Sequence, residues 1–306
     1  METLVVLLRL GQYLGAVLLF GVPLFFALRM PGSRAAISRW PRGVLLAAAV
    51  LTAATALGGL VVQTAVTAGS LDEALKPATL SYMVFGSSLG MAFVLRAAAA
   101  LLAAVLLLAL RPGRGNWTLL ALVGAAVSAS LAWTGHGAAT EGARGVVHLL
   151  SDIVHALAAG LWLGGLAALG LLLARRRGDP PDDRLAHAAL AGFASLGPLA
   201  VGLLVATGLL NSWFLIGLDN AARVLESAYG GLLVLKLALF GGMLALAASN
   251  RYRLTPNLES ALDDGEGLAD AVRALRRSLG LESALAVALL LAVAVMGTLA
   301  PPAAMG

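Results

Sequence analysis

The sequence predicts an all-α polytopic membrane protein with eight transmembrane helices, and three observations lead to this fold class. The 306 residues are 60% hydrophobic and 12% charged, whereas soluble domains have about 25% charged residues. The mean hydropathy of the chain is +0.91. Its apolar residues form long unbroken runs, not the alternating pattern of membrane β-strands. We therefore expect one membrane domain over residues 1–306 and no separate soluble domain.

Eight apolar runs are long enough to cross the hydrocarbon core, which takes about 20 helical residues. In chain order they lie at residues 4–28, 43–66, 79–110, 117–135, 146–174, 188–217, 229–249 and 281–300. The first run contains Arg9 and lacks the cleavage site of a signal peptide, so we expect it to remain as a span. The hydrophilic segment 250–280 has acidic residues followed by basic ones, which predicts a solvated cytoplasmic helix.

The distribution of Lys and Arg predicts the orientation of the spans. Fifteen of these residues lie in the loops after the first, third, fifth and seventh runs, and three lie in the alternate loops. Because Lys and Arg concentrate in cytoplasmic loops, both termini should lie outside. The net charge of +5 therefore reflects membrane topology, and we expect a lipid bilayer and no nucleic acid as a partner.

Polar residues that are costly in a membrane collect in the outer halves of the predicted spans. His148, Asp152 and His155 follow one another at four and three residues, which places them on one helical face. Trp162 continues this face by another seven residues, and His136 ends the preceding span at a similar depth. Glycines after His155 would let a neighbouring backbone approach closely. We predict that the three histidines and Asp152 share a pocket that is open to the outside.

This group of residues suits a metal or a haem, although a structural network remains an alternative. The chain has no cysteine, so a soft metal must use His or Met. Imidazole binds Cu, Zn, Fe and Ni, and a carboxylate such as Asp152 commonly orients a ligating His. Alternatively, Asp152 neutralises a cation within the membrane, with Lys236 expected first and Arg96 second.

Several polar motifs resemble those of one protein family. The run W-T-G-H at 133–136 and the pattern H-x3-D-x2-H-A-x-A-A-x-x-W-x-G-G at 148–165 look like the signature of the CopD family of bacterial copper-resistance membrane proteins. Further similar motifs are L-L-V-L-K at 232–236, N-R-x-R-L-x-P at 250–256 and G-T-L-A-P-P at 297–302. The resemblance is strongest over residues 117–302.

The resemblance implies an eight-helix protein of the bacterial inner membrane, in which the termini that the Lys and Arg residues place outside would be periplasmic. It also implies uptake or transfer of copper ions, received from a periplasmic copper-binding partner, with His136, His148 and His155 handling the metal and Asp152 in support. We therefore expect a transporter more than an enzyme. An electron-transfer protein with haem b held by the same histidines is the main alternative. A zinc enzyme that activates water is a weaker one. His187, near the opposite membrane face, is expected to have an interfacial role.

Overall fold

The computed structural model describes residues 1–29, 40–135, 142–174, 180–217 and 224–304. Eight of the described helices are long and apolar enough to cross a membrane, which confirms the predicted fold class. These helices are α1 (Glu2–Arg29), α2 (Trp40–Ala68), α5 (Ser88–Ala109), α6 (Arg114–Ser130), α7 (Gly142–Ala174), α8 (Pro180–Ile216), α9 (Ala228–Ser249) and α11 (Leu268–Met296). The shorter helices are α3 (Leu71–Ala74), α4 (Pro77–Gly86) and α10 (Thr255–Asp264).

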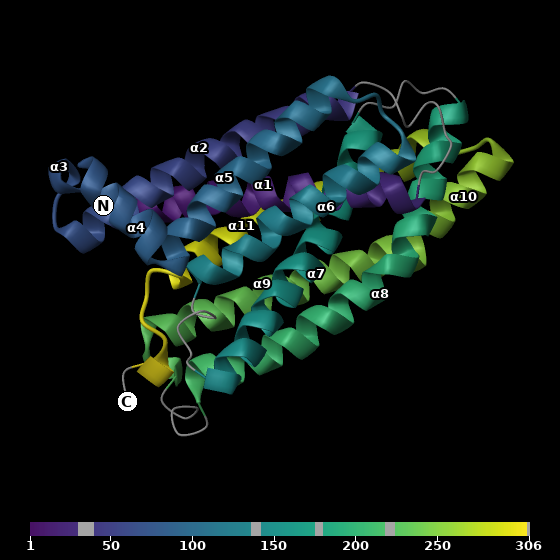
Figure 1. The fold of residues 1–306 in the computed structure, drawn as a ribbon. Coiled ribbons are helices and arrows are strands. Elements are labelled where there is room, and N and C mark those ends of the chain that lie inside the picture. The colour runs from purple at the N-terminus through teal and green to yellow at the C-terminus, as the bar shows by residue number, and fades with distance from the viewer. Residues whose placement is uncertain (30–39, 136–141, 175–179, 218–223, 305–306) are drawn as a thin grey trace.

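The long helices run roughly along one direction, and the N-terminus and the C-terminal end lie at the same end of the bundle (Figure 1). We call this the terminal end. Short helices α3 and α4 also lie there, whereas α10 lies at the opposite end. Under the topology that the Lys and Arg residues predict, the terminal end faces the outside and α10 faces the cytoplasm. That orientation stays a prediction.

The third span begins later than its hydropathy predicts. The apolar run starts near residue 79, but α4 ends at Gly86 and α5 starts at Ser88. Between them, Ser87 has an extended backbone with φ −139° and ψ 142°, and its hydroxyl accepts the N–H of Gly90 at 3.0 Å. A serine N-cap therefore starts a new helix inside a continuous apolar run.

Helix α1 occupies a central position, because it packs against α2, α6, α7 and α11. At its crossing with α7, a side chain on Gly21 would overlap the carbonyl oxygen of Gly160, and one on Gly164 would overlap the Gly21 backbone. Small residues of this kind let two membrane helices approach to backbone contact. The close approach expected at the glycines of the fifth span is thus made by α1.

The hydrophilic segment 250–280 is helical but packs more closely than the predicted solvated helix. Helix α9 continues through a π-helical turn at Asn250–Leu254 into α10, and Gly265 and Gly267, both with positive φ, reverse the chain before α11. Leu258 and Leu275 are 1% and 0% exposed in the main hydrophobic core. Apolar side chains at helical spacing bury one face of this segment, while its charges remain at the surface.

Candidate metal centre

The predicted polar face of α7 lies against α8. The carboxylate of Asp152 accepts a hydrogen bond from Asn211 Nδ2 at 2.6 Å. One turn further along α7, His155 Nδ1 lies 2.8 Å from the Thr207 hydroxyl. One turn before Asp152, the His148 ring stacks on Phe214, with centroids 4.7 Å apart and planes at 15°. Since the residue numbers rise along α7 as they fall along α8, the two antiparallel helices align these polar and aromatic contacts in one row.

The hydrogen bonds of Thr207 favour one tautomer of the His155 imidazole. The Thr207 hydroxyl donates to the carbonyl oxygen of Leu203 at 2.6 Å. A hydroxyl has one proton, so when Thr207 makes this bond its oxygen accepts the N–H of His155 Nδ1. In the neutral imidazole, Nε2 then keeps its lone pair. This is the arrangement of metal-binding histidines, which donate one N–H to a neighbouring group and coordinate through the other nitrogen.

His155 lines a cavity of about 240 Å³ between α7, α8, α9 and α11, which we call the His155 cavity. Lys236 of α9 is the charged residue of its lining, and the remaining lining is mostly apolar. The indole of Trp162, only 2% exposed, forms the wall of this cavity with Phe240, against which it packs edge-on at 5.5 Å. The lining residues are His155, Ala159, Trp162, Leu163, Leu204, Val205, Gly208, Leu209, Ser212, Leu233, Lys236, Leu237, Phe240, Met243, Leu289 and Leu290.

The three predicted histidines differ in what the structure describes of them. His155 reaches the cavity, whereas His148 is 1% exposed beneath Phe214 and is not among the lining residues. Seven residues of helix separate the two by about 10 Å along the axis. His136 lies outside the described residues. However, a side chain at the neighbouring Gly135 would contact Asp152 Oδ2, so the W-T-G turn lies beside the acidic group. Convergence of all three histidines stays a prediction.

The two cations expected near Asp152 have different surroundings. Lys236 is within coulombic range of Asp152, and an ion pair between the two stays a prediction. Arg96 of α5 is completely buried, and its guanidinium donates to Gln12, to the hydroxyl and carbonyl oxygens of Ser130, and to Thr134. Arg96 therefore binds uncharged oxygens of α1 and α6. The hydrogen bonds of its guanidinium link α5 to α1 and to the end of α6.

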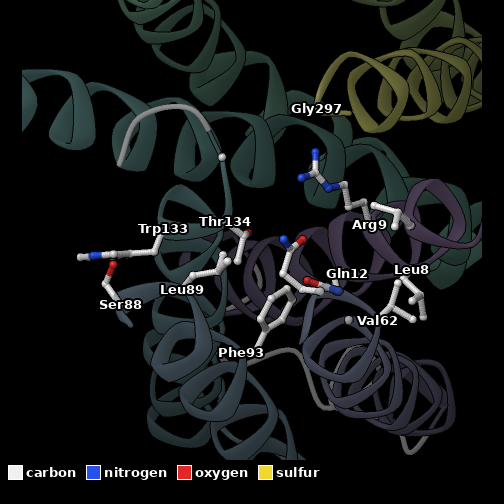
Figure 2. Close-up of a pocket in the computed structure, with 14 residues that line it drawn as sticks. Leu8, Arg9, Gln12, Val62, Ser88, Leu89, Phe93, Trp133, Thr134 and Gly297 are labelled. Carbon is white, nitrogen blue, oxygen red and sulfur yellow. The ribbon is translucent and has the colours of Figure 1, made fainter. Parts of the chain in front are cut away.

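A second and larger cavity of about 340 Å³ lies between α1, α2 and α5 (Figure 2). Arg9, Gln12, Phe93 and Thr134 are among the side chains around it, and Arg9 extends towards Gly297 at the end of α11. A guanidinium at the wall of a cavity inside a membrane repels other cations. The His155 cavity also has a cation in its lining, Lys236, but that lysine is within coulombic range of Asp152, and the cavity contains an imidazole that can bind a metal ion.

Sequence reasoning did not identify the α8 partners of the site. Thr207, Asn211 and Phe214 follow one another at four and three residues, the same spacing as the α7 set, and this repeat was a signal in the sequence. His187 lies far from them, 3.8 Å from Glu259 of α10, in line with an interfacial role. Among the described residues, no group of three or more His, Asp or Glu side chains forms a complete metal site.

The fold and this site define a polytopic membrane protein with a buried, histidine-containing polar centre between its helices. Comparison with protein families is more specific. Residues 1–146 match the family described as copper resistance protein D-like, N-terminal domain, and residues 187–296 match copper resistance protein D. The chain belongs to the copper resistance protein D family, which confirms the resemblance seen in the motifs. The match also covers the N-terminal part, where the motifs gave little signal.

Three relatives show how far the similarity extends. Copper resistance protein D of Pseudomonas syringae pv. tomato is 35% identical over 306 residues, covering 98% of this chain and 97% of that protein. Copper transport protein CutJ of Bacillus subtilis is 30% identical over 239 residues, 76% of this chain and 41% of that protein. Inner membrane protein YebZ of Escherichia coli is 30% identical over 158 residues, 52% of this chain and 53% of that protein. No solved structure matches the chain. The protein is a multi-pass inner-membrane protein.

Proposed function

We propose that this protein takes up or transfers copper ions, and that the His155 cavity holds the ion within the membrane. The observation that carries the proposal is the orientation of His155. Its Nδ1 is engaged by Thr207, which leaves Nε2 as a ligand at the cavity. Imidazole is a suitable ligand for copper, and the relatives named for copper resistance and copper transport agree with this choice of metal.

The groups around His155 adjust the charge of the site. Asp152 and Lys236 carry opposite charges within coulombic range, so together they add no net charge to the empty site. A monovalent ion at His155 would add less uncompensated charge to this site than a divalent ion. Asp152 is in turn held by Asn211, which prevents the carboxylate from turning away. Asp152 and Lys236 are thus supporting residues in this proposal.

The route of the ion follows from the position of the other histidines on the chain. His148 lies about 10 Å nearer the terminal end than His155, and His136 follows the W-T-G turn beside Asp152. In the predicted orientation this end is periplasmic. A periplasmic copper-binding protein would deliver copper to His136 and His148, and His155 would receive it deeper in the membrane.

The test is the copper stoichiometry of purified variants together with cellular copper accumulation. His155→Ala should abolish copper binding and the copper-dependent phenotype, because a site of few ligands loses much of its affinity with one imidazole. His148→Ala should lower cellular copper accumulation, because the delivery step loses its imidazole. His187→Ala is the matched control and should leave both measurements unchanged. Insertion should survive in all three variants, since alanine removes a polar group from the membrane. Unchanged stoichiometry in the His155 variant would refute the assignment.

The haem alternative lacks a specific observation in its favour. His148 and His155 lie on one face of α7, so they cannot bind one haem from opposite sides. Among the described lining residues of the His155 cavity, no second histidine faces His155. The absorption spectrum of the same purified variants separates the two functions. A Soret band that disappears in the His155 variant would favour the cytochrome.

A further inference from the structure

A third cavity lies on the other side of Trp162 from the His155 cavity. It measures about 240 Å³ and lies between α7, α8, α9 and α11 towards the end of the bundle opposite the termini. We call it the Glu282 cavity, after the carboxyl group in its lining. Trp162 lines both cavities, so one indole separates the histidine side from the carboxyl side. The other residues that line the Glu282 cavity are Leu169, Leu190, Phe193, Ala194, Gly197, Pro198, Val201, Leu244, Ala247, Ala248, Asn250, Arg251, Tyr252, Thr255 and Leu279.

Glu282 is a buried carboxyl group inside a membrane-spanning helix. Glu282 is 1% exposed, and Asn250, at the end of α9, is 7% exposed. Asn250 Nδ2 donates to Glu282 Oε2 at 2.9 Å. The other two oxygens of this pair, Glu282 Oε1 and Asn250 Oδ1, have no hydrogen-bond partner among the described residues. Both are acceptors when the carboxyl group is ionised. The indole N–H of Trp162 is a donor beside the carboxyl group, whereas Asn250 Oδ1 has no donor among the described residues.

The charged and titratable neighbours do not neutralise Glu282. Arg251 and Tyr252 of the π-helical turn also line the Glu282 cavity. However, the Arg251 guanidinium donates to the carbonyl oxygen of Ala194 at 2.7 Å and lies over the ring of Tyr252, which is exposed. Helices α7 and α8 contribute only uncharged side chains to the described lining, including the Trp162 indole next to the carboxyl group. On α11 itself, Arg276 donates to the Leu173 carbonyl oxygen at 3.0 Å. An ionised carboxylate here would be a buried charge with no described counter-ion, which is costly in a membrane.

We infer that Glu282 and Asn250 form a proton-binding site that exchanges through the Glu282 cavity. A proton on Glu282 Oε1 supplies the donor that Asn250 Oδ1 lacks. Together with the bond from Asn250 Nδ2 to Glu282 Oε2, this makes a two-bond pair between a carboxylic acid and an amide. One proton thereby removes the negative charge and satisfies both remaining oxygens. Asparagine suits this role because its amide offers a donor and an acceptor side by side.

The cavity gives this proton a route. A carboxyl group that gains and loses a proton inside a span gives the protein an exchangeable charge, which a proton-coupled carrier requires. In the predicted topology the exchange would be with the cytoplasm. The site depends on Glu282 and Asn250 and not on the histidines, so it can be examined in copper-free protein and independently of the copper proposal.

Carbodiimide labelling tests the site directly. Dicyclohexylcarbodiimide is an apolar reagent to which a protonated carboxyl group adds: the acid proton moves to a carbodiimide nitrogen, the carboxyl oxygen bonds to the central carbon, and the acyl group then migrates to nitrogen. Nothing leaves, so the peptide gains the mass of one reagent molecule. We expect mass spectrometry to find this adduct at Glu282, with a yield that falls as pH rises. The Glu282→Gln variant should lose it, and the solvent-exposed Glu259 should stay unlabelled in both.

Thermal unfolding in detergent provides the second measurement. Glutamine reproduces the neutral pair, since its amide can donate to Asn250 Oδ1 and accept from Asn250 Nδ2. Glu282→Gln should therefore melt no lower than the native protein. The native protein should lose melting temperature relative to the variant as pH rises from mildly acidic to mildly alkaline, because the proton is lost. An unlabelled Glu282, or a glutamine variant that is destabilised at every pH, would overturn the inference and indicate an ionised structural carboxylate.

Discussion

The hydroxyl of Thr207 provides the sharpest test of the proposed copper centre. Thr207→Val keeps the shape of the side chain but removes the acceptor for His155 Nδ1. The imidazole then loses the hydrogen bond that favours the tautomer with a free Nε2 lone pair. Thr207 touches no metal in this proposal and acts only through His155. We therefore expect it to be a positioning residue.

The loss of copper affinity expected for Thr207→Val can be estimated from groups that support ligating histidines in other metal sites. Loss of a hydrogen bond to a ligating His typically lowers metal affinity by about 10- to 100-fold. At about 1.4 kcal/mol for each factor of ten, this corresponds to about 1.4–2.8 kcal/mol of binding free energy. Thr207→Ser retains the hydroxyl and should restore most of the affinity. Competition with a chromophoric copper chelator in detergent measures all of these variants on one scale.

Thr64→Val is the matched control. Thr64 is 1% exposed on α2 and donates to the carbonyl oxygen of Leu60 at 2.7 Å, as Thr207 does to Leu203 at 2.6 Å. The two valine variants lose the same bond within a helix, and only Thr207→Val loses the contact with a histidine. Equal copper affinity in both would refute the assigned role of Thr207 and the tautomer deduced for His155.

Three further predictions concern the site, the packing and the topology. Asn211→Leu should weaken copper binding and lower the free energy of unfolding by about 1.5–3 kcal/mol, because Asp152 loses a hydrogen bond to a charged group; chelator competition and chemical denaturation check this. Gly164→Leu should prevent accumulation of folded protein, at a cost above the roughly 1–3 kcal/mol usual for overpacking, whereas Gly170→Leu on the same helix, where nothing lies within 4 Å, should be tolerated. Size-exclusion profiles of detergent extracts distinguish these two glycine variants. A reporter inserted at Gly265 should be active in the cytoplasm and one at either terminus in the periplasm; the opposite pattern would show that the orientation is wrong.

The sequence alone determined the number and approximate bounds of the spans. A chain in lipid must satisfy its backbone hydrogen bonds within each segment, so length and hydropathy are sufficient to locate helices. The same regularity determined that His148, Asp152 and His155 share a face, since the helical period is independent of the neighbours. Where a local polar group competed with this pattern, as Ser87 does between α4 and α5, hydropathy alone placed the helix start too early.

Only the tertiary structure decided which helix covers each polar face. The pairing of His155 with Thr207 and of Asp152 with Asn211 depends on the register between α7 and α8, and register comes from side-chain packing over the whole bundle. The close approach of α1 to α7 at Gly21 and Gly164 helps to fix the position of α7 within that bundle. In the same way, Asn250 and Glu282 are 32 residues apart in the chain and meet only because α9 and α11 pack together. Periodicity orders residues along one helix, whereas contacts between helices depend on the complementary shapes of both surfaces.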